Sequence, residues 1–185
     1  MKRVISIDLS SNTMGFAVFY KSVETLKVVS SGILNFGTET LDGMKLRHSG
    51  QQIQDFFKDF PPDIILLEEI PHCRMKKVAI ALGKIHGIFY EQLSIFDENR
   101  GRFAEIYEVN NLTWKKMLCG VGNASKVDIR QHILLHEGFF LKTFAYDESD
   151  AIGLGLAFLK NKPIERNISK KARNLWTRLQ KLPEN

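Results

Sequence analysis

Cysteine is scarce in this sequence: Cys73 and Cys119 are the only two among 185 residues, and no metal-type spacing joins them. This scarcity excludes a disulfide scaffold. The chain also has no recognisable secretory signal and no apolar run near the roughly 18 residues of a membrane helix. We therefore expect a protein of the reducing cytoplasm, with no membrane partner.

Extremes of composition are missing as well. Hydrophobic residues make up 44% of the chain, aromatic residues 10% and charged residues 25%, which excludes a disordered or collagen-like chain. The length suits one domain with a buried core.

Positive charge is concentrated at one end of the chain. The net charge is +5, yet residues 160–185 contain 8 of the 26 lysines and arginines and only 2 of the 21 acidic residues. Such a tail suits a polyanion, and nucleic acid is the leading candidate. The alternative is a solvated tail that keeps the protein soluble.

Hydrophobic patterning predicts a mixed sheet within residues 1–160. The predicted elements, in chain order, are strands at 3–9, 14–20 and 26–34, a helix at 41–58, a strand at 63–69, a helix at 75–95, a strand at 103–109, and helices at 111–118, 124–137 and 147–160. Short turns between the first three strands indicate an antiparallel meander, and the unbroken run Ile64–Leu67 is typical of a parallel strand buried on both faces. We expect an α/β fold with a five-stranded sheet, three antiparallel strands and then parallel ones, and helices on both faces.

Two helical segments carry apolar residues at helical spacing. Residues 161–185 are predicted to form a basic C-terminal helical extension that lies on DNA, packs on the body or pairs with another chain. Its stripe comprises Ile168, Ala172, Leu175, Leu179 and Leu182, and the expected core contacts of helix 41–58 are Leu41, Met44, Ile53, Phe56 and Phe57.

Four acidic residues stand where an acid is costly unless it is used. Asp8 closes the first strand, Glu68 closes the fourth, and Asp147 and Asp150 open the last core helix, three residues apart on one face. Each has a simpler interpretation as a turn residue, a strand-end solubility residue or a helix-capping acid. If the first and fourth strands are neighbours, all four carboxylates can meet.

Clustered carboxylates repel each other unless divalent cations lie among them. Oxygen ligands favour Mg²⁺ or Mn²⁺ over Zn²⁺. Two such ions about 4 Å apart can activate a water and stabilise the leaving oxygen in phosphodiester hydrolysis.

The order and spacing of five motifs, across about residues 3–160, resemble the RuvC-type Holliday junction resolvases of the ribonuclease H-like superfamily. The motifs are Ile7-Asp8 with a small-residue turn and Gly15, Leu66-Leu67-Glu68-Glu69, Ala81–Gly87, Trp114-Lys115-Lys116 leading to Gly120–Lys126, and Asp147–Ala151. Each motif is weak by itself.

The resemblance implies a metal-dependent endonuclease that resolves four-way DNA junctions by paired symmetric cuts. It implies that Asp8, Glu68, Asp147 and Asp150 hold two Mg²⁺ or Mn²⁺ ions per site and that no nucleotide cofactor is needed. Only Glu68 of the Glu68-Glu69 pair should join the cluster, because adjacent strand residues point to opposite faces.

Basic residues and a dimer follow from the same resemblance. Lys115 and Lys126 match family lysines that contact DNA near the active centre, and Lys116 competes with Lys115 for that position. Lys126 is also placed in the catalytic group, where its ammonium would offset charge at the scissile phosphate. Gly83 and Gly87 lie on the helix that contributes to the family's homodimer; the alternative is close packing of this helix on its own sheet.

The sequence departs from the family after the strand glutamate. The cellular enzymes have an aromatic wedge there, whereas this chain has Ile70-Pro71-His72-Cys73-Arg74. Arg74, Lys76 and Lys77 still offer phosphate contacts. The divergence suggests a phage or viral relative, which would work in the host cytoplasm.

Other functions stay open on the sequence. One is a nuclease acting mainly on forks, flaps or RNA–DNA hybrids, and another is a junction-binding protein that does not cut. A nucleotide-binding domain of the actin–hexokinase type fits less well, because that fold normally needs two domains.

Overall fold

A computed structural model describes residues 1–22, 26–37, 43–71, 74–136, 145–160 and 170–181. It contains strands β1 Lys2–Leu9, β2 Thr13–Lys21, β3 Leu26–Asn35, β4 Ile64–Glu68 and β5 Glu105–Val109, and helices α1 Gly43–Asp59, α2 Lys76–Arg100, α3 Asn111–Cys119, α4 Lys126–His136, α5 Tyr146–Leu159 and α6 Lys170–Gln180. Each predicted strand and helix is present. The main difference is α2, which runs on to Arg100 and ends at Gly101 in the left-handed conformation.

The five strands form one sheet in the order β3-β2-β1-β4-β5. β1 pairs antiparallel with β2, and β2 with β3. β1 pairs parallel with β4, and β4 with β5. The first and fourth strands are therefore neighbours, which was the condition for the predicted meeting of the carboxylates.

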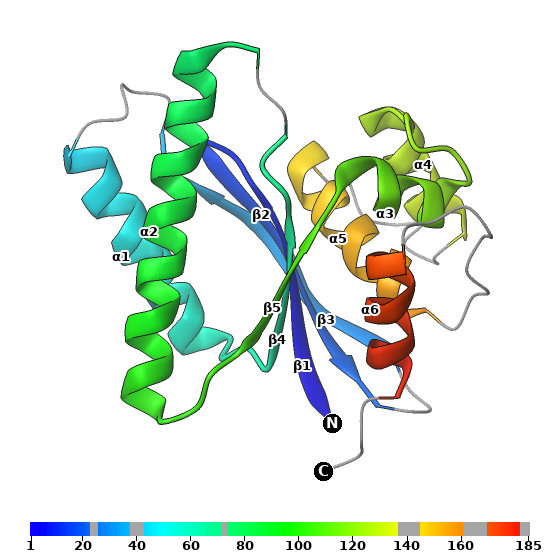
Figure 1. The fold of residues 1–185 in the computed structure, drawn as a ribbon, viewed down its shortest axis with the longest axis horizontal. Coiled ribbons are helices and arrows are strands. Elements are labelled where there is room, and N and C mark those ends of the chain that lie inside the picture. Colours follow the sequence, from blue (N-terminus) through cyan, green and yellow to red (C-terminus); the bar gives the residue numbers. More distant parts are fainter. Residues whose placement is uncertain (23–25, 38–42, 72–73, 137–144, 161–169, 182–185) are drawn as a thin grey trace.

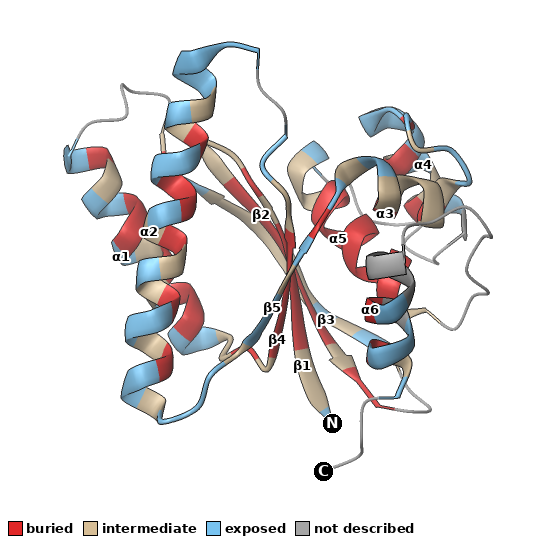
Figure 2. Ribbon diagram, in the orientation of Figure 1, coloured by how far each residue is buried: buried red, intermediate tan, exposed pale blue. Residues whose placement is uncertain are grey.

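Side-chain alternation divides the sheet into two cores. Ile5, Ile7, Ile65 and Leu67 face α1 and α2, whereas Val4, Ile64 and Leu66 face α5. Figure 1 shows α1 and α2 on one side of the sheet and α3 to α6 on the other, and Figure 2 shows the buried residues along the sheet and α5. The prediction of helices on both faces is confirmed.

Helix α5 lies very close to the sheet because its glycines leave room. A Cβ on Gly155 would collide with the Phe19 ring of β2, and a Cβ on Gly153 would lie 2.9 Å from Leu118 of α3. The Ser6 hydroxyl of β1 donates to the Ala151 carbonyl oxygen at 2.6 Å. These contacts fix the height of α5 over β1 and β2.

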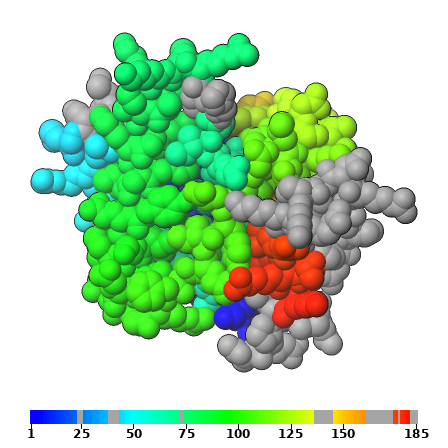
Figure 3. Space-filling view, viewed as in Figure 1, coloured from blue at the N-terminus to red at the C-terminus, as the bar shows by residue number. Residues whose placement is uncertain are grey.

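Helix α6 packs on the body of the protein, which was one of the three predicted alternatives. Leu175 and Leu179 are buried in the same core as Phe158 of α5, and the Gln180 amide donates to the Phe158 carbonyl oxygen at 2.9 Å. In space-filling view, α6 lies directly beside the surface of β5 and α3 (Figure 3). Ile168 and Leu182 lie outside the described residues, and the division at residue 160 stays a prediction.

One core expectation for the first helix is wrong. Ile53, Phe56 and Phe57 are buried as predicted, but Met44 is 83% exposed. It lies in the first turn of α1, where the adjacent Lys45 is the side chain that turns inward, bound to Asn12 and Gly37. Leu41 falls outside the described residues. No helix in the described part of the chain is long and apolar enough to cross a membrane.

Candidate active site

Asp8 and Glu68 stand side by side at the ends of neighbouring strands. The parallel register pairs Ile7 with Leu67, so Asp8 and Glu68 are the next residues on each strand. Both lie two residues beyond side chains that face α5, namely Ser6 and Leu66. Alternation therefore directs both carboxylates toward the α5 face of the sheet.

The first turn of α5 supplies the other two acids, Asp147 and Asp150. Gly15, which pairs with Asp8 across β1 and β2, touches the backbone of Asp147, and a Cβ there would collide with its carbonyl oxygen. The Thr13 hydroxyl donates to Asp147 Oδ2 at 2.7 Å. Strand β2 thus positions the start of α5 next to Asp8.

Glu68 is held by helix α3. The Trp114 indole Nε1–H donates to Glu68 Oε2 at 2.9 Å, and the Asn111 amide donates to Oε1. Trp114 is fully buried, so its ring is fixed by the core. Glu69, just beyond the end of β4, instead accepts a hydrogen bond from the Asn110 amide and is not among the charges that act on Asp8 or Asp150.

Lys126, the first residue of α4, lies over the α5 acids. Its Nζ is 2.8 Å from Asp147 Oδ1 and 3.5 Å from Asp150 Oδ2, and its side chain is 48% exposed. One lysine among four acids leaves the group formally negative. Its pairing with Asp147 and Asp150 places Lys126 next to the acids, as the sequence predicted.

The carboxylates perturb one another. Burial, followed by the charges of Glu68 and Asp150, raises the pKa of Asp8 well above its usual value. Burial likewise raises the pKa of Asp150 to about 6, against the opposing charges of Lys126 and Lys115. For Asp147, burial acts upward, but the hydrogen bonds from Lys126 and Thr13 bring its pKa below the usual value.

The residues present fit a hard divalent cation in their chemistry. Every acid of the group offers oxygen, Asp150 Oδ1 is buried without a hydrogen-bond partner, and the Asp8 carboxylate bonds to none of the described residues. These are atoms that a cation would satisfy. Within the described residues, however, no three His, Cys, Asp or Glu side chains already stand as a complete ligand set.

Of the predicted DNA-contacting residues, Lys126 and Lys115 interact with the acids. Lys115 of α3 stacks on the Trp114 ring at 5.6 Å, and its charge acts on Asp150. Lys116 has no such link to the acids. Arg74, Lys76 and Lys77 are exposed where the chain leaves β4 and enters α2.

Sequence reasoning missed the three residues that orient the carboxylates: Thr13, Asn111 and Trp114. Trp114 was noticed as part of a motif, but its bond to Glu68 depends on how α3 packs on α5. Nothing in the sequence specifies that distance.

Comparisons with known proteins identify the family of this chain. The family model of crossover junction endodeoxyribonuclease RuvC matches residues 4–158. A crossover junction endodeoxyribonuclease RuvC from Caldicellulosiruptor saccharolyticus is 23% identical over 158 residues, which are 85% of this chain and 92% of the relative.

Two solved structures are similar in fold. T. thermophilus RuvC in complex with Holliday junction substrate has a TM-score of 0.65 at 13% identity, covering 84% of this chain and 92% of its own. The yeast mitochondrial Holliday junction resolvase Ydc2 has a TM-score of 0.64 at 11% identity, covering 97% of this chain and 82% of its own. These likenesses confirm the predicted ribonuclease H-like sheet.

Proposed function

Because this chain belongs to the RuvC family of crossover junction endodeoxyribonucleases, we propose that it cuts four-way DNA junctions by paired, symmetric phosphodiester hydrolysis. The observation that supports this most directly is the convergence of Asp8, Glu68 and the two acids of α5 at one end of the sheet. Water is the attacking group, and the products carry 5′-phosphate and 3′-hydroxyl ends.

The family is metal-dependent, and we assign the metal ligands to Asp8, Glu68, Asp147 and Asp150. The oxygen-only donor set favours Mg²⁺ or Mn²⁺, and two ions per site fit this reaction class. Bound divalent ions would supply an activated water and charge neutralisation at the phosphodiester.

The side chains around the acids fix the orientation of the carboxylates and offset negative charge. Trp114 and Asn111 hold Glu68 in one orientation, and Thr13 does the same for Asp147. Lys126 rests on the α5 acids with half of its side chain exposed, so its ammonium can contact the scissile phosphate when DNA enters.

We also propose residues that contact DNA and a homodimeric assembly. Lys115, Lys116, Arg74, Lys76 and Lys77 are assigned to the phosphate backbone, where lysine and arginine position a duplex without reading its sequence. A homodimer would present two sites to the two-fold symmetric junction. A cytoplasmic location, or the host cytoplasm for a phage-encoded protein, and the phage or viral origin stay predictions.

The experiment compares Asp8→Asn and Glu68→Gln with the intact protein on a mobile junction, a fork, a flap and plain duplex, each with Mg²⁺, Mn²⁺ or chelator. We expect both variants to bind the junction but not to cut it. Asp55→Asn is the matched control, since Asp55 lies on exposed α1 and pairs only with its own helix.

Three results would contradict the proposal in different ways. Normal cutting by Asp8→Asn would show that the active centre has been assigned to the wrong residues. Faster cutting of forks or flaps than of four-way junctions would show that the preferred substrate belongs to another class of branched DNA. Tight junction binding without any cutting by the intact protein would indicate a binding protein instead.

A further inference from the structure

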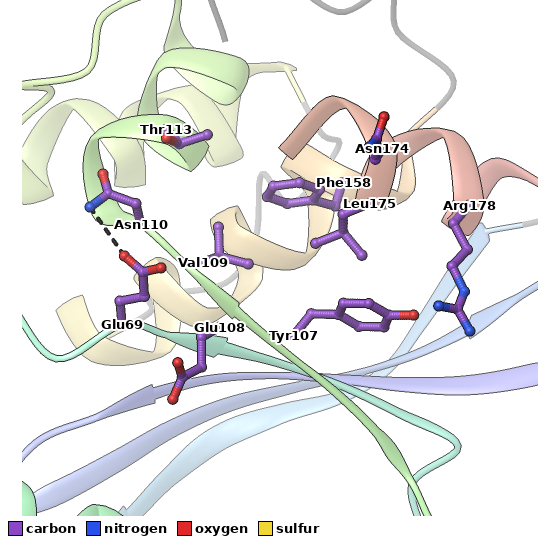
Figure 4. A pocket seen from close by; sticks show the side chains of 10 residues that line it. All are labelled: Glu69, Tyr107, Glu108, Val109, Asn110, Thr113, Phe158, Asn174, Leu175 and Arg178. Carbon is purple, nitrogen blue, oxygen red and sulfur yellow. Dashed lines mark hydrogen bonds between the residues drawn. The ribbon is translucent and has the colours of Figure 1, made fainter. Parts of the chain in front are cut away.

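A second hollow lies beside the edge strand, away from the carboxylates of the active site. This cavity of about 320 Å³ is bounded by β5, the start of α3, Phe158 of α5 and helix α6. Figure 4 shows Glu69 and Asn110 at one end, Arg178 at the other, and the Tyr107 ring across from Phe158 and Leu175. Its volume is in the range of sites for small ligands.

Several residues that line the cavity are sequence neighbours of the residues that form the Glu68 site. Glu69 follows Glu68, Asn110 precedes Asn111, and Thr113 precedes Trp114, so three lining residues are direct neighbours of the Glu68 group. A displacement of helix α3 would therefore move residues of both sites. A nucleotide next to a phosphate held at Glu68 would lie close to the cavity.

The cavity walls suit a flat ring with polar edges. Tyr107, Phe158 and Leu175 offer aromatic and apolar surface, while Asn174 and Glu69 offer hydrogen-bonding groups. The Asn110 side chain is already engaged, because its oxygen caps α3 and its amide donates to Glu69. Pockets that receive unstacked nucleobases combine these two kinds of surface.

Charge argues against a phosphate as the occupant. Of the two acids in the lining, Glu69 lies at one end of the cavity, whereas the Glu108 carboxylate accepts a hydrogen bond from Tyr90 of α2 on the opposite side of the sheet. The cation of the lining, Arg178, is bound to Glu105 at 2.7 Å and stacks over the Tyr107 ring at 5.5 Å. A carboxylate accepts hydrogen bonds from the amino group of a base, and it repels a phosphate.

We propose that this cavity receives an unpaired nucleobase, preferably one with an amino group, from the DNA strand that is cut. The inference rests on the proposed function, because it needs a DNA strand at Glu68. The chain has no aromatic residue in Ile70–Arg74, after the catalytic strand, so a base taken up here would help to keep the junction centre open. Extruding a base is least costly where pairing is already broken, as it is at a junction.

The first test replaces single nucleotides flanking the cut by an abasic unit or by purine, which lacks the amino group. At one position, the intact protein should lose roughly tenfold in cutting rate, the effect of one stacked or hydrogen-bonded base. Asn174→Trp, which fills the cavity from the exposed side of α6, should cut the normal junction at that reduced rate and be insensitive to the abasic unit.

The matched control is Thr177→Trp. Thr177 is exposed on the same helix but does not line the cavity, so this variant should behave as the intact protein does. Thermal unfolding of both variants checks that α6 stays packed. Equal rates and equal abasic sensitivity in the two variants would overturn the inference.

The second test does not need cutting. Junctions with 5-iodocytosine at the same position are irradiated in complex with Asp8→Asn, and the crosslinked peptide is identified by mass spectrometry. A crosslink at Tyr107 or Phe158, lost in the double variant with Asn174→Trp, supports the inference. A crosslink at residues outside the cavity, or no crosslink, overturns it.

The two tests also separate this inference from the proposed function. Junction cutting without a crosslink in the cavity leaves the nuclease intact and removes the base site. A crosslink without cutting by the intact protein keeps the base site and removes the nuclease. A protein that neither binds nor cuts a junction contradicts both.

Discussion

Asp8 is a buried carboxyl whose surroundings disfavour its charged form. Its carboxylate makes no hydrogen bond or ion pair with the described residues, and burial together with Glu68 and Asp150 raises its pKa. A carboxyl whose pKa is raised on folding stabilises the native state at low pH, and that stability is lost as the pH rises through the folded-state value. At neutral pH, the metal-free protein is therefore destabilised by its own active site.

Asp8→Asn should consequently raise the unfolding temperature of the metal-free protein at about pH 7.5, and the gain should shrink as the pH falls toward the unfolded-state pKa of an aspartate, about 4. Mg²⁺ should stabilise the intact protein but not this variant. Thermal unfolding with and without chelator measures both effects. Asp55→Asn serves as the control, and an equal Mg²⁺ effect in intact protein and Asp8→Asn would rule out Asp8 as a ligand.

The Trp114 indole donates a hydrogen bond to Glu68, which we propose as a metal ligand. Trp114→Phe keeps an aromatic ring in the core but removes the indole N–H donor to Glu68. Groups that orient a metal ligand in this way are worth roughly 10- to 100-fold in metal affinity or activity. We expect Trp114→Phe to need at least about tenfold more Mg²⁺ for half-maximal cutting.

Leu118→Ala, on the same helix, distinguishes the effect of lost packing from the effect of the lost hydrogen bond to Glu68. Leu118 is buried against α5 but does not touch Glu68. It should lower the unfolding temperature without changing the Mg²⁺ dependence. An Mg²⁺ titration that is unchanged in Trp114→Phe would contradict the orienting role.

The acids of the site could be predicted from the sequence, whereas their partners could not. An acid after a run such as Ile64–Leu67 is conspicuous, because local sequence shows that it ends a buried strand. The bond from Trp114 to Glu68 spans 46 residues and depends on the tilt of α3. Sequence spacing carries no information about such a tilt.

At the scale of whole elements, the joint between β2 and α5 sets the geometry of the site. Gly15 of β2 lies against the backbone of Asp147, and Gly155 lies against Phe19. The helix is thus seated on the sheet at both of its ends. This close packing is possible only because Gly15 and Gly155 have no side chain.

Gly15→Ala should push the first turn of α5 away from β1. We expect Asp147 and Asp150 to separate from Asp8, with cutting reduced by at least roughly tenfold, since small misplacements of reacting groups are costly. Stability should also fall, by about 1–3 kcal/mol for overpacking. Gly43→Ala is the control, because nothing lies within 4 Å of a Cβ there. Full cutting activity in Gly15→Ala would show that this contact does not position the acids.

Strand and helix limits were predictable because period-2 and period-3.6 patterns are local. The position of α6 was not. Its apolar stripe is equally compatible with DNA, another chain or the body, and only the fit of Leu175 and Leu179 against Phe158 selects the body. The exposure of Met44 was also missed, because helical spacing alone does not show that Lys45 is the buried residue of this turn.

At the scale of the whole molecule, the layer of α1 and α2 leaves one helix face uncovered. Gly83 and Gly87 are exposed, no atom of the described chain lies within 4 Å of a Cβ at either position, and the neighbouring Ile80 is 48% exposed. The alternative of close packing of these glycines on their own sheet is therefore wrong. An open strip of this kind lets a second helix backbone approach, as the predicted homodimer requires.

Gly87→Gln should separate the two copies without harming either one. A side chain at a close helix contact costs about 1–3 kcal/mol, which is roughly 5- to 150-fold in the dimer dissociation constant. Glutamine is also a better helix former than glycine by about 0.5–1 kcal/mol, so the monomer should unfold no earlier than the intact protein. Sedimentation velocity over a range of concentrations measures the change. On a supercoiled plasmid with an extruded cruciform, the variant should accumulate nicked circles, whereas the intact dimer should give linear product from paired cuts. Gly43→Gln is the matched control on α1. If Gly87→Gln sediments as Gly43→Gln does and still linearises the plasmid, the dimer does not use this face of α2.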